Sequence, residues 1–375
     1  MKKMRSPFSF FRFLIHGFIF SILLPFLLAG VVTTYSAPFT SETLKSWFNN
    51  VEVNELFIHF IKAENHFFIN KEEEIHSYSL SNITFKLATN IQPTDIRTFL
   101  GRELPGFSIF DTDILVAGEG TDYTNLPIES APPMEVLLKE REIAKEQLGE
   151  QEEKPTVTGK ETVLIYQTHS WEAYLPLLNG VTKPNEAVSS KEQANVVGVG
   201  KRLAAALQER GIGVIHDKTN MTEKLKNNGW NYYQSYTMSR NVVQETLATN
   251  EDLNFIIDIH RDAARKETTT KKINGKSYAK VWFVVGKDHK NYEQNSKIAL
   301  ELNKKLEEKY PGISRGVIAK GKSQGDGRYN QDLSARAMLV EFGGVDNDST
   351  ELQNTIEAFA EIFSEYYWKA EMVNG

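Results

Sequence analysis

Two histidines in this 375-residue chain come shortly after apolar runs that are typical of buried strands. His169 follows the run Val163–Tyr166, and His260 follows the run Leu253–Ile257. Neither run has a helical period, which favours strands of a parallel sheet. Ligands bind at the carboxyl edge of such a sheet, so we expect both imidazoles to lie there. Two imidazoles at one edge could hold a zinc ion that keeps one coordination position open.

A glutamate stands at the end of a third apolar run. Glu341 follows Ala337–Val340, and a carboxylate at the end of a buried strand is desolvated, which raises its pKa. A raised pKa would let Glu341 take a proton from zinc-bound water and pass it to a leaving amine. The alternative role for Glu341 is a salt bridge to Arg336 or Arg261.

Two glutamates are candidates for the third zinc ligand. Glu192 begins a predicted helix and could swing back to the sheet edge, although an acidic residue in a first helical turn also complements the helix dipole. Glu172 comes three residues after His169 and could be a ligand, a partner of a ligand or a proton shuttle. Either choice would leave zinc with a net positive charge, so that a bound water would ionise near neutral pH.

The composition narrows the chemistry further. The chain has no cysteine, which excludes disulfides, thiol nucleophiles, iron–sulfur clusters and cysteine-ligated zinc, and leaves histidine and carboxylate as metal ligands. The formal net charge is −6, so nothing in the composition indicates nucleic-acid binding. A Gly-x-Ser-x-Gly motif is absent, and a serine hydrolase is therefore unsupported.

One stretch matches the phosphate-binding loop pattern of two glycines followed by Lys-Ser. It covers residues 316–323, with the sequence GVIAKGKS. A phosphate-binding loop needs a strand before it and a helix after it, but Pro311-Gly312 precedes this stretch closely and the loop-like segment Gln324–Arg328 follows. We therefore interpret it as a flexible basic loop at the rim of the site, and we expect no nucleotide ligand.

The alternation of apolar runs and helical segments from residue 161 onward predicts the fold class. Strands are expected to end at Gln167, His216, His260, Val285 and Glu341, and helices are expected over about 192–207, 232–247, 291–310 and 349–372. Strands that alternate with helices indicate an α/β domain. The prediction is a mostly parallel sheet over residues 161–375, covered by helices on both faces.

The N-terminus predicts a membrane anchor. Basic residues precede the apolar run Phe13–Val32, which is about as long as a helix that crosses a bilayer. Positive charge before the run predicts that residues 1–12 are cytoplasmic and that the bulk of the chain is extracytoplasmic. The run is longer than a usual signal-peptide core, and the cleavage site near Ala37 is poor because Tyr35 stands where a small residue is preferred, so an uncleaved anchor is expected.

Two segments separate the anchor from the α/β domain. Residues 33–93 carry apolar and aromatic side chains at helical spacing, which predicts a small helical module close to the membrane. Residues 94–160 lose this periodicity and contain a proline cluster and a stretch rich in Glu, Lys and Arg. This composition is typical of a linker, with an isolated strand near Asp113–Val116.

Several blocks of the sequence resemble the type 3 family of zinc-dependent N-acetylmuramoyl-L-alanine amidases. The blocks are Thr168–Pro176, Ile257–Ala263, Tyr329–Ser334 and Val340–Asn347. The resemblance implies the α/β fold of that family, zinc on His169, Glu192 and His260, and Glu341 as the catalytic carboxylate. The chain departs from the family where the Trp171–Pro176 turn replaces a glycine-rich stretch, which keeps Glu172 as the alternative ligand and as a further catalytic candidate.

The resemblance also implies a biological role. These enzymes hydrolyse the amide that joins muramic acid to the stem peptide of peptidoglycan. The blocks are most similar to sporulation members of the family, which implies additional cleavage of peptide cross-links and work beside stage II sporulation proteins D and M during engulfment, in the space between the forespore and mother-cell membranes. The alternative interpretation is a non-catalytic cell-wall scaffold that positions other hydrolases.

Overall fold

The computed structural model describes residues 112–127, 132–145, 159–322 and 324–374. These residues contain a seven-stranded sheet with the order β1-β8-β7-β9-β4-β2-β3 and a separate two-stranded hairpin, β5-β6. The predicted membrane anchor Phe13–Val32 and the predicted helical module 33–93 lie outside the described residues. Among the helices that are described, none is long and apolar enough to cross a membrane.

Four neighbouring strands run parallel to one another. They are β2 (Glu161–Tyr166), β3 (Gly213–His216), β4 (Phe255–Asp262) and β9 (Ala337–Gly344), with β4 between β2 and β9. Successive side chains of a strand point to opposite faces. In β4, Ile257 and Ile259 therefore enter the large core on one face, while Asp258 and His260 point to the other. The carboxyl ends of these strands meet at one edge of the sheet.

The remaining strands make the sheet mixed. β7 (Val281–Gly286) pairs antiparallel with β9, β8 (Ser314–Lys320) pairs parallel with β7, and β1 (Asp113–Ala117) pairs antiparallel with β8. The sequence predicts a mostly parallel sheet, and β7 is where the direction reverses. Between β4 and β7 the chain forms a short helix, α10 (Lys266–Thr269), and the hairpin of β5 (Thr270–Ile273) and β6 (Lys276–Ala279).

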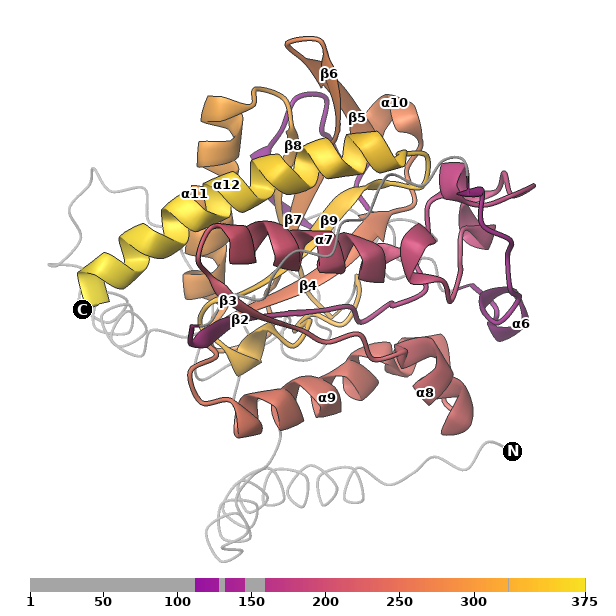
Figure 1. The fold of residues 1–375 in the computed structure, drawn as a ribbon, viewed down its shortest axis with the longest axis horizontal. Coiled ribbons are helices and arrows are strands. Elements are labelled where there is room, and N and C mark those ends of the chain that lie inside the picture. The colour runs from indigo at the N-terminus through magenta and orange to yellow at the C-terminus, as the bar shows by residue number, and fades with distance from the viewer. Residues whose placement is uncertain (1–111, 128–131, 146–158, 323, 375) are drawn as a thin grey trace, which may run out of the picture. The chain divides into compact units, whose positions relative to one another are not determined.

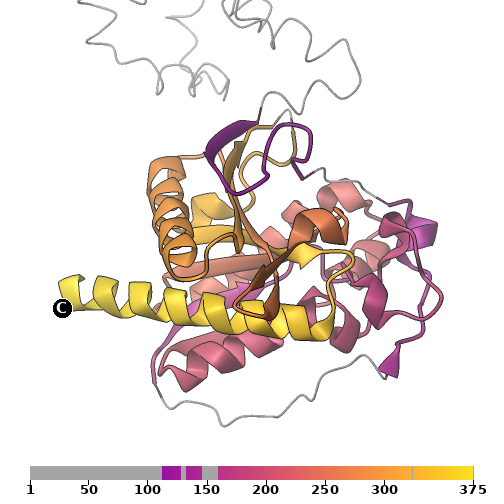
Figure 2. The ribbon, with the colours of Figure 1, turned by 90° about the horizontal axis from the view of Figure 1, so that it is seen from above.

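Helices cover both faces of the sheet, as Figures 1 and 2 show. One face carries α7 (Val196–Glu209), α11 (Tyr292–Lys309) and α12 (Ser349–Asn374), whose apolar side chains pack with the strands in the largest core. The other face carries α9 (Ser235–Thr249), which also packs against α8 (Met221–Asn227). A one-turn helix, α6 (Met134–Leu137), lies in the segment before β2.

The start of α7 differs from the prediction in a way that matters for the site. The sequence predicts a helix from Glu192, but residues Glu192–Ala194 form a separate 3-10 turn and α7 begins at Val196. Asn195 caps the helix because its side chain accepts a hydrogen bond from the backbone of Val197. A side chain at Gly198 would place a Cβ 2.2 Å from the carbonyl oxygen of Glu192, so the 3-10 turn packs directly on the first turn of α7.

The stretch that matches a phosphate-binding loop is mostly a buried strand. Residues 316–320 belong to β8, and Gly316 has a φ of 107° beside the carbonyl oxygen of Val116 in β1. Only glycine can occupy this position, since an added Cβ would lie 2.0 Å from that oxygen. The interpretation of these residues as a flexible basic loop is therefore wrong for their first five positions. The close approach explains why a glycine precedes the apolar run.

Candidate active site

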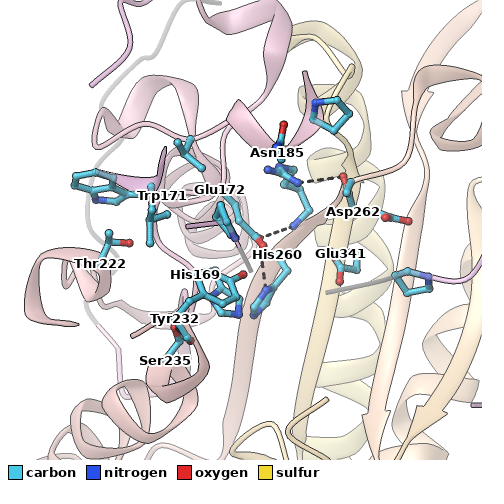
Figure 3. Close-up of a pocket in the computed structure, with 17 residues that line it drawn as sticks. His169, Trp171, Glu172, Asn185, Thr222, Tyr232, Ser235, His260, Asp262 and Glu341 are labelled. Atoms are coloured by element: carbon cyan, nitrogen blue, oxygen red, sulfur yellow. Dashed lines mark hydrogen bonds and ion pairs between the residues drawn. The ribbon is translucent and has the colours of Figure 1, made fainter. Parts of the chain in front are cut away.

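A pocket opens where β2, β4 and β9 end at the carboxyl edge of the sheet (Figure 3). His169, Glu172, His260 and Glu341 all line it. Its walls also include Pro127, Pro132, Trp171, Tyr232, Arg261 and Asp262. The fold therefore brings together four of the five residues that the sequence singled out. These four residues come from positions 169 to 341 of the chain.

The two imidazoles lie against each other at the bottom of this site. The ring centroids of His169 and His260 are 5.1 Å apart and the rings are nearly perpendicular, at 81°. Tyr232 stacks on His169 with a centroid distance of 4.2 Å and an interplanar angle of 4°, which fixes the plane of that ring. Both histidines are buried, and the Nε2 atom of His169 has no hydrogen-bond partner.

The surroundings of the two histidines shift their pKa values in opposite directions. Burial lowers the pKa of His169 to about 4, so its imidazole is neutral near pH 7 and is ready to act as a ligand. Burial also acts to lower the pKa of His260, but the carboxylates of Asp258 and Glu172 outweigh it and raise this pKa well above its ordinary value. Two rings in one pocket are thus held in different electrostatic states.

Glu172 is the carboxylate that the structure places beside the histidines. Its Oε2 lies 3.5 Å from Nδ1 of His260 and accepts a hydrogen bond from the backbone nitrogen of Arg261 at 3.1 Å. Burial acts to raise the pKa of Glu172, but His260 outweighs it and lowers the pKa to about 2. The turn is fixed locally, because the backbone nitrogen of Glu172 donates to the carbonyl oxygen of His169.

Glu341 stands on the neighbouring strand, in register with His260. Burial raises the pKa of Glu341 to about 8, and its Oε2 has no hydrogen-bond partner. The two arginines considered as salt-bridge partners of Glu341 have other partners among the described residues. Arg336 pairs with Glu371 at 3.2 Å, and Arg261 donates to three backbone carbonyl oxygens. The carboxyl group of Glu341 is thus free to exchange a proton in the pocket.

The structure does not bring Glu192 to the histidines. Its carboxylate lies 3.2 Å from Nζ of Lys201 and 3.6 Å from Nζ of Lys218, is partly exposed and does not line the pocket. The cause is the 3-10 turn described above, which packs the backbone of Glu192 against α7 and leaves its side chain among lysines. Of the two candidate glutamates, Glu172 is the one at the histidine pair.

The side chains of the site are of the types that bind zinc in proteins. A neutral imidazole with an unpartnered nitrogen, a second imidazole and an ionised carboxylate are ligands that zinc prefers in proteins. In the described part of the chain, however, no group of three or more His, Asp or Glu side chains has the arrangement of a metal site. The donors are therefore gathered in one pocket, and the zinc assignment stays a prediction.

One wall of the pocket comes from a part of the chain that the sequence presents as a linker. Three buried cations hold residues 118–127 through backbone carbonyl oxygens: Lys280 donates to Glu119, Arg315 to Asn125 and Lys320 to Pro127. Arg315 also forms a buried ion pair with Asp262 at the pocket. No local sequence pattern signals these contacts, apart from the charged residues inside the apolar strand β8.

The fold and the pocket define a class: an α/β protein with buried histidines and carboxylates at the carboxyl edge of its parallel strands. The family model described as Stage II sporulation protein P matches residues 94–364 of the chain. The Stage II sporulation protein P of Bacillus subtilis (strain 168) is 48% identical over 370 residues, which is 95% of this chain and 92% of the relative. The chain therefore belongs to the stage II sporulation protein P family.

A solved structure shares a weaker similarity. Cwp6 from Clostridium difficile has a TM-score of 0.32 and 15% sequence identity to this chain. The match covers 55% of this chain and 29% of Cwp6, so the chain spans less than a third of that protein. A similarity at this level does not decide the fold family, and the type 3 amidase fold stays a prediction.

Proposed function

We propose that this sporulation protein is a zinc-dependent hydrolase of peptidoglycan that cleaves the amide between N-acetylmuramic acid and L-alanine. The observation that carries the proposal is the pairing of two buried imidazoles with two carboxyl groups of opposite pKa shift in one pocket, the buried Glu341 and the half-buried Glu172. Carboxyl groups whose environments push their pKa values apart are a recurrent feature of acid–base sites. The family relationship supports the sporulation role.

His169, His260 and Glu172 are the residues that would hold the zinc ion, with Glu172 in the place that the family resemblance gives to Glu192. Zinc bound there would supply a Lewis acid for the scissile carbonyl and for the attacking water. The stacking of Tyr232 on His169 and the contact of Glu172 with His260 keep the donors oriented before any metal arrives. Such preorganisation reduces the cost of binding.

Glu341 moves the proton in this proposal. With a pKa of about 8, its carboxyl group exchanges protons near neutral pH, which is the property of an efficient general base and acid. It accepts a proton from the attacking water and delivers it to the amine nitrogen that leaves as the free amino group of L-alanine. The unpartnered Oε2 of Glu341 supports this role, since no other protein group competes for it.

The lining of the pocket suits a substrate that is part sugar and part peptide. Trp171 and Tyr232 provide aromatic surface, while Asn185, Thr222 and Ser235 provide amide and hydroxyl groups. Mixed aromatic and polar walls of this kind recognise polar ligands that have apolar faces. We also propose cleavage of peptide cross-links, anchoring through Phe13–Val32 and action beside stage II sporulation proteins D and M between the two membranes during engulfment.

The test uses the full-length protein, purified in detergent, on isolated peptidoglycan. Amide cleavage creates new amino groups on L-alanine, which can be labelled and counted. We expect a chelator to stop their release and added zinc to restore it, and His169→Ala to abolish it while the circular dichroism spectrum is unchanged. A protein that binds the wall but never releases these groups would instead be a non-catalytic scaffold.

A matched pair of variants tests the choice of glutamate. Glu172→Gln is expected to lower zinc affinity and release by at least tenfold, because it removes the charge beside His260. Glu192→Gln is the control and is expected to keep both, because its carboxylate pairs with Lys201 and Lys218 outside the pocket. The opposite result for the two variants would return Glu192 to the metal site.

A further inference from the structure

A buried chain of hydrogen bonds lies behind His260. The amide of Asn330 donates to Oγ of Ser239 at 2.9 Å, Oγ of Ser239 and Oγ1 of Thr168 share a hydrogen bond at 2.8 Å, and Oγ1 of Thr168 donates to Oδ2 of Asp258 at 2.6 Å. All four side chains are at most 3% exposed. They come from four different parts of the fold: the N-cap of the 3-10 turn η8 (Gln331–Leu333), α9, the segment just after β2, and β4.

The shortest contacts set the direction of the bonds in this chain. The hydroxyl group of Ser239 also faces the carbonyl oxygen of Tyr236, but at 3.3 Å that acceptor is farther away than Oγ1 of Thr168 at 2.8 Å. A hydroxyl group has one proton to donate, and that of Thr168 goes to Asp258, so Thr168 must accept from Ser239. Ser239 in turn accepts from the amide of Asn330. All donors therefore point toward the carboxylate of Asp258, which also accepts from the backbone nitrogen of Thr168 at 2.9 Å. Aligned bonds of this kind polarise one another and hold their terminal acceptor firmly.

The terminal acceptor touches the imidazole of His260. Oδ1 of Asp258 lies 3.1 Å from Nε2 of His260, two residues along the same strand face. The atoms are within hydrogen-bonding distance but are not well aligned for a hydrogen bond, so the contact is electrostatic in this conformation. The other ring nitrogen, Nδ1, lies 3.5 Å from Glu172. The ring is thus held between one carboxylate behind it and one in the pocket.

The far end of the chain is anchored by an unusual turn. Tyr329 and Asn330 both have positive φ values, 52° and 56°, which non-glycine residues rarely adopt. Gln331 secures the turn, because its side chain donates to the carbonyl oxygen of Val284 and accepts from the backbone of Gly286. The turn therefore delivers the amide of Asn330 to Ser239 at a fixed position.

We propose that Asp258 is a positioning residue for His260, and that Thr168, Ser239 and Asn330 hold it in place. Asp258 lies beside Nε2 of His260, and Nδ1 is directed to Glu172, on the side where the proposed zinc would be held. This inference rests on the proposed function. A carboxylate that accepts from the second nitrogen of a histidine ligand fixes the ring and increases its basicity, and its loss typically weakens metal binding about 10- to 100-fold.

The experiment measures zinc affinity of the full-length protein in detergent by competition with a chromophoric chelator, together with the absorption spectrum of the cobalt(II)-substituted protein. Asp258→Asn keeps the shape of the side chain and is expected to weaken zinc binding about 10- to 100-fold and to alter the cobalt spectrum. Thr168→Val should weaken binding less, and Thr168→Ser, which keeps the hydroxyl group, should restore the wild-type affinity. If Asp258→Asn does not fold, the two Thr168 variants decide.

Asp332→Asn is the matched control. Asp332 joins the same turn to the same helix through a bidentate ion pair with Arg240, at 2.7 Å, but it makes no contact with the hydrogen-bonded chain. The control is expected to lower the melting temperature without changing zinc affinity. Wild-type affinity in both Asp258→Asn and Thr168→Val overturns this inference alone. A wild-type protein that binds no zinc overturns the proposed function and this inference with it.

Discussion

The two sides of the pocket are built in different ways. On the sheet side, His260 and Glu341 stand on adjacent parallel strands, and His169 and Glu172 follow a third. On the opposite side, Pro127, Pro132 and Leu137 line the pocket. We call this side the upstream wall. Pro127 ends the segment 118–127, which is held to the sheet by the side chains of buried cations. The first side depends on strand register, and the second depends on a few long-range polar contacts.

This difference separates two kinds of consequence for a mutation. A change on the sheet side alters the chemistry while the core that carries the strands stays intact. A change among the cations alters the stability and position of the wall, because a buried charge without its partner is strongly unfavourable. The upstream wall is therefore expected to govern stability and substrate binding, and the sheet side is expected to govern the rate of the chemical step.

The largest expected effect is on the sheet side, with Glu341→Gln. The variant cannot exchange a proton, and loss of a general acid–base group lowers rates by about 100- to 10,000-fold. Its shape is nearly that of the protonated side chain, so the fold is expected to be retained. Release of L-alanine amino groups gives the rate, and the melting temperature gives the stability. Unchanged release would remove Glu341 from the proton transfer.

The same variant has a pH signature in the metal-free protein. Because the folded-state pKa of Glu341 is raised to about 8 from an ordinary value of 4.5, the folded protein keeps a proton that the unfolded chain releases. This contribution to the free energy of unfolding is fully present below pH 4.5 and is lost as the pH rises to about 8. Glu341→Gln should therefore gain stability relative to the wild type over that range, as measured by urea denaturation.

The next largest effect is expected on the upstream wall, with Arg315→Met. Arg315 is buried, forms an ion pair with Asp262 and lies 3.8 Å above the ring of Trp282. Removing one partner of a buried pair typically costs about 3–5 kcal/mol in stability, which chemical denaturation would measure. The control is Arg210→Met, whose partly exposed pair with Glu357 should contribute less than about 1 kcal/mol. Equal losses of stability in both variants would show that burial does not increase the contribution of the ion pair to stability.

Sequence patterns predicted the sheet side because its signals are local. The apolar runs of β2, β4 and β9 place His169, His260 and Glu341 near the ends of strands. Because β4 pairs in parallel with both β2 and β9, these strand ends lie at the same edge of the sheet. Asp258 was missed as a site residue, although a carboxylate inside an apolar strand, two residues from a histidine, is a readable signal. Its partners Ser239 and Asn330 are not readable, since their role depends on how α9 and the turn before η8 pack.

The upstream wall and the position of Glu192 could not be predicted for the same reason. The strand Asp113–Val116 was expected to be isolated in a linker, and its pairing with β8 depends on residues more than 200 positions away in the chain. The sequence pattern predicted a helix from Glu192. It did not predict the 3-10 turn that directs the side chain of Glu192 to lysines. Both errors concern side-chain direction set by tertiary packing, which local periodicity does not encode.

The smallest expected effect sharpens the contrast between the two sides. Oγ1 of Thr121 donates a hydrogen bond to the carbonyl oxygen of Arg315 at 2.8 Å, and thus ties the wall to β8. Thr121→Val keeps the volume and removes the bond, which should cost about 1 kcal/mol in stability. Because the proposed function gives the wall a role in substrate binding but no reacting group, KM for peptidoglycan fragments should rise while kcat is unchanged. Thr124→Val, which loses only an exposed bond to Asp122, should change neither constant, and a fall in kcat for Thr121→Val would mean that the wall takes part in the chemical step.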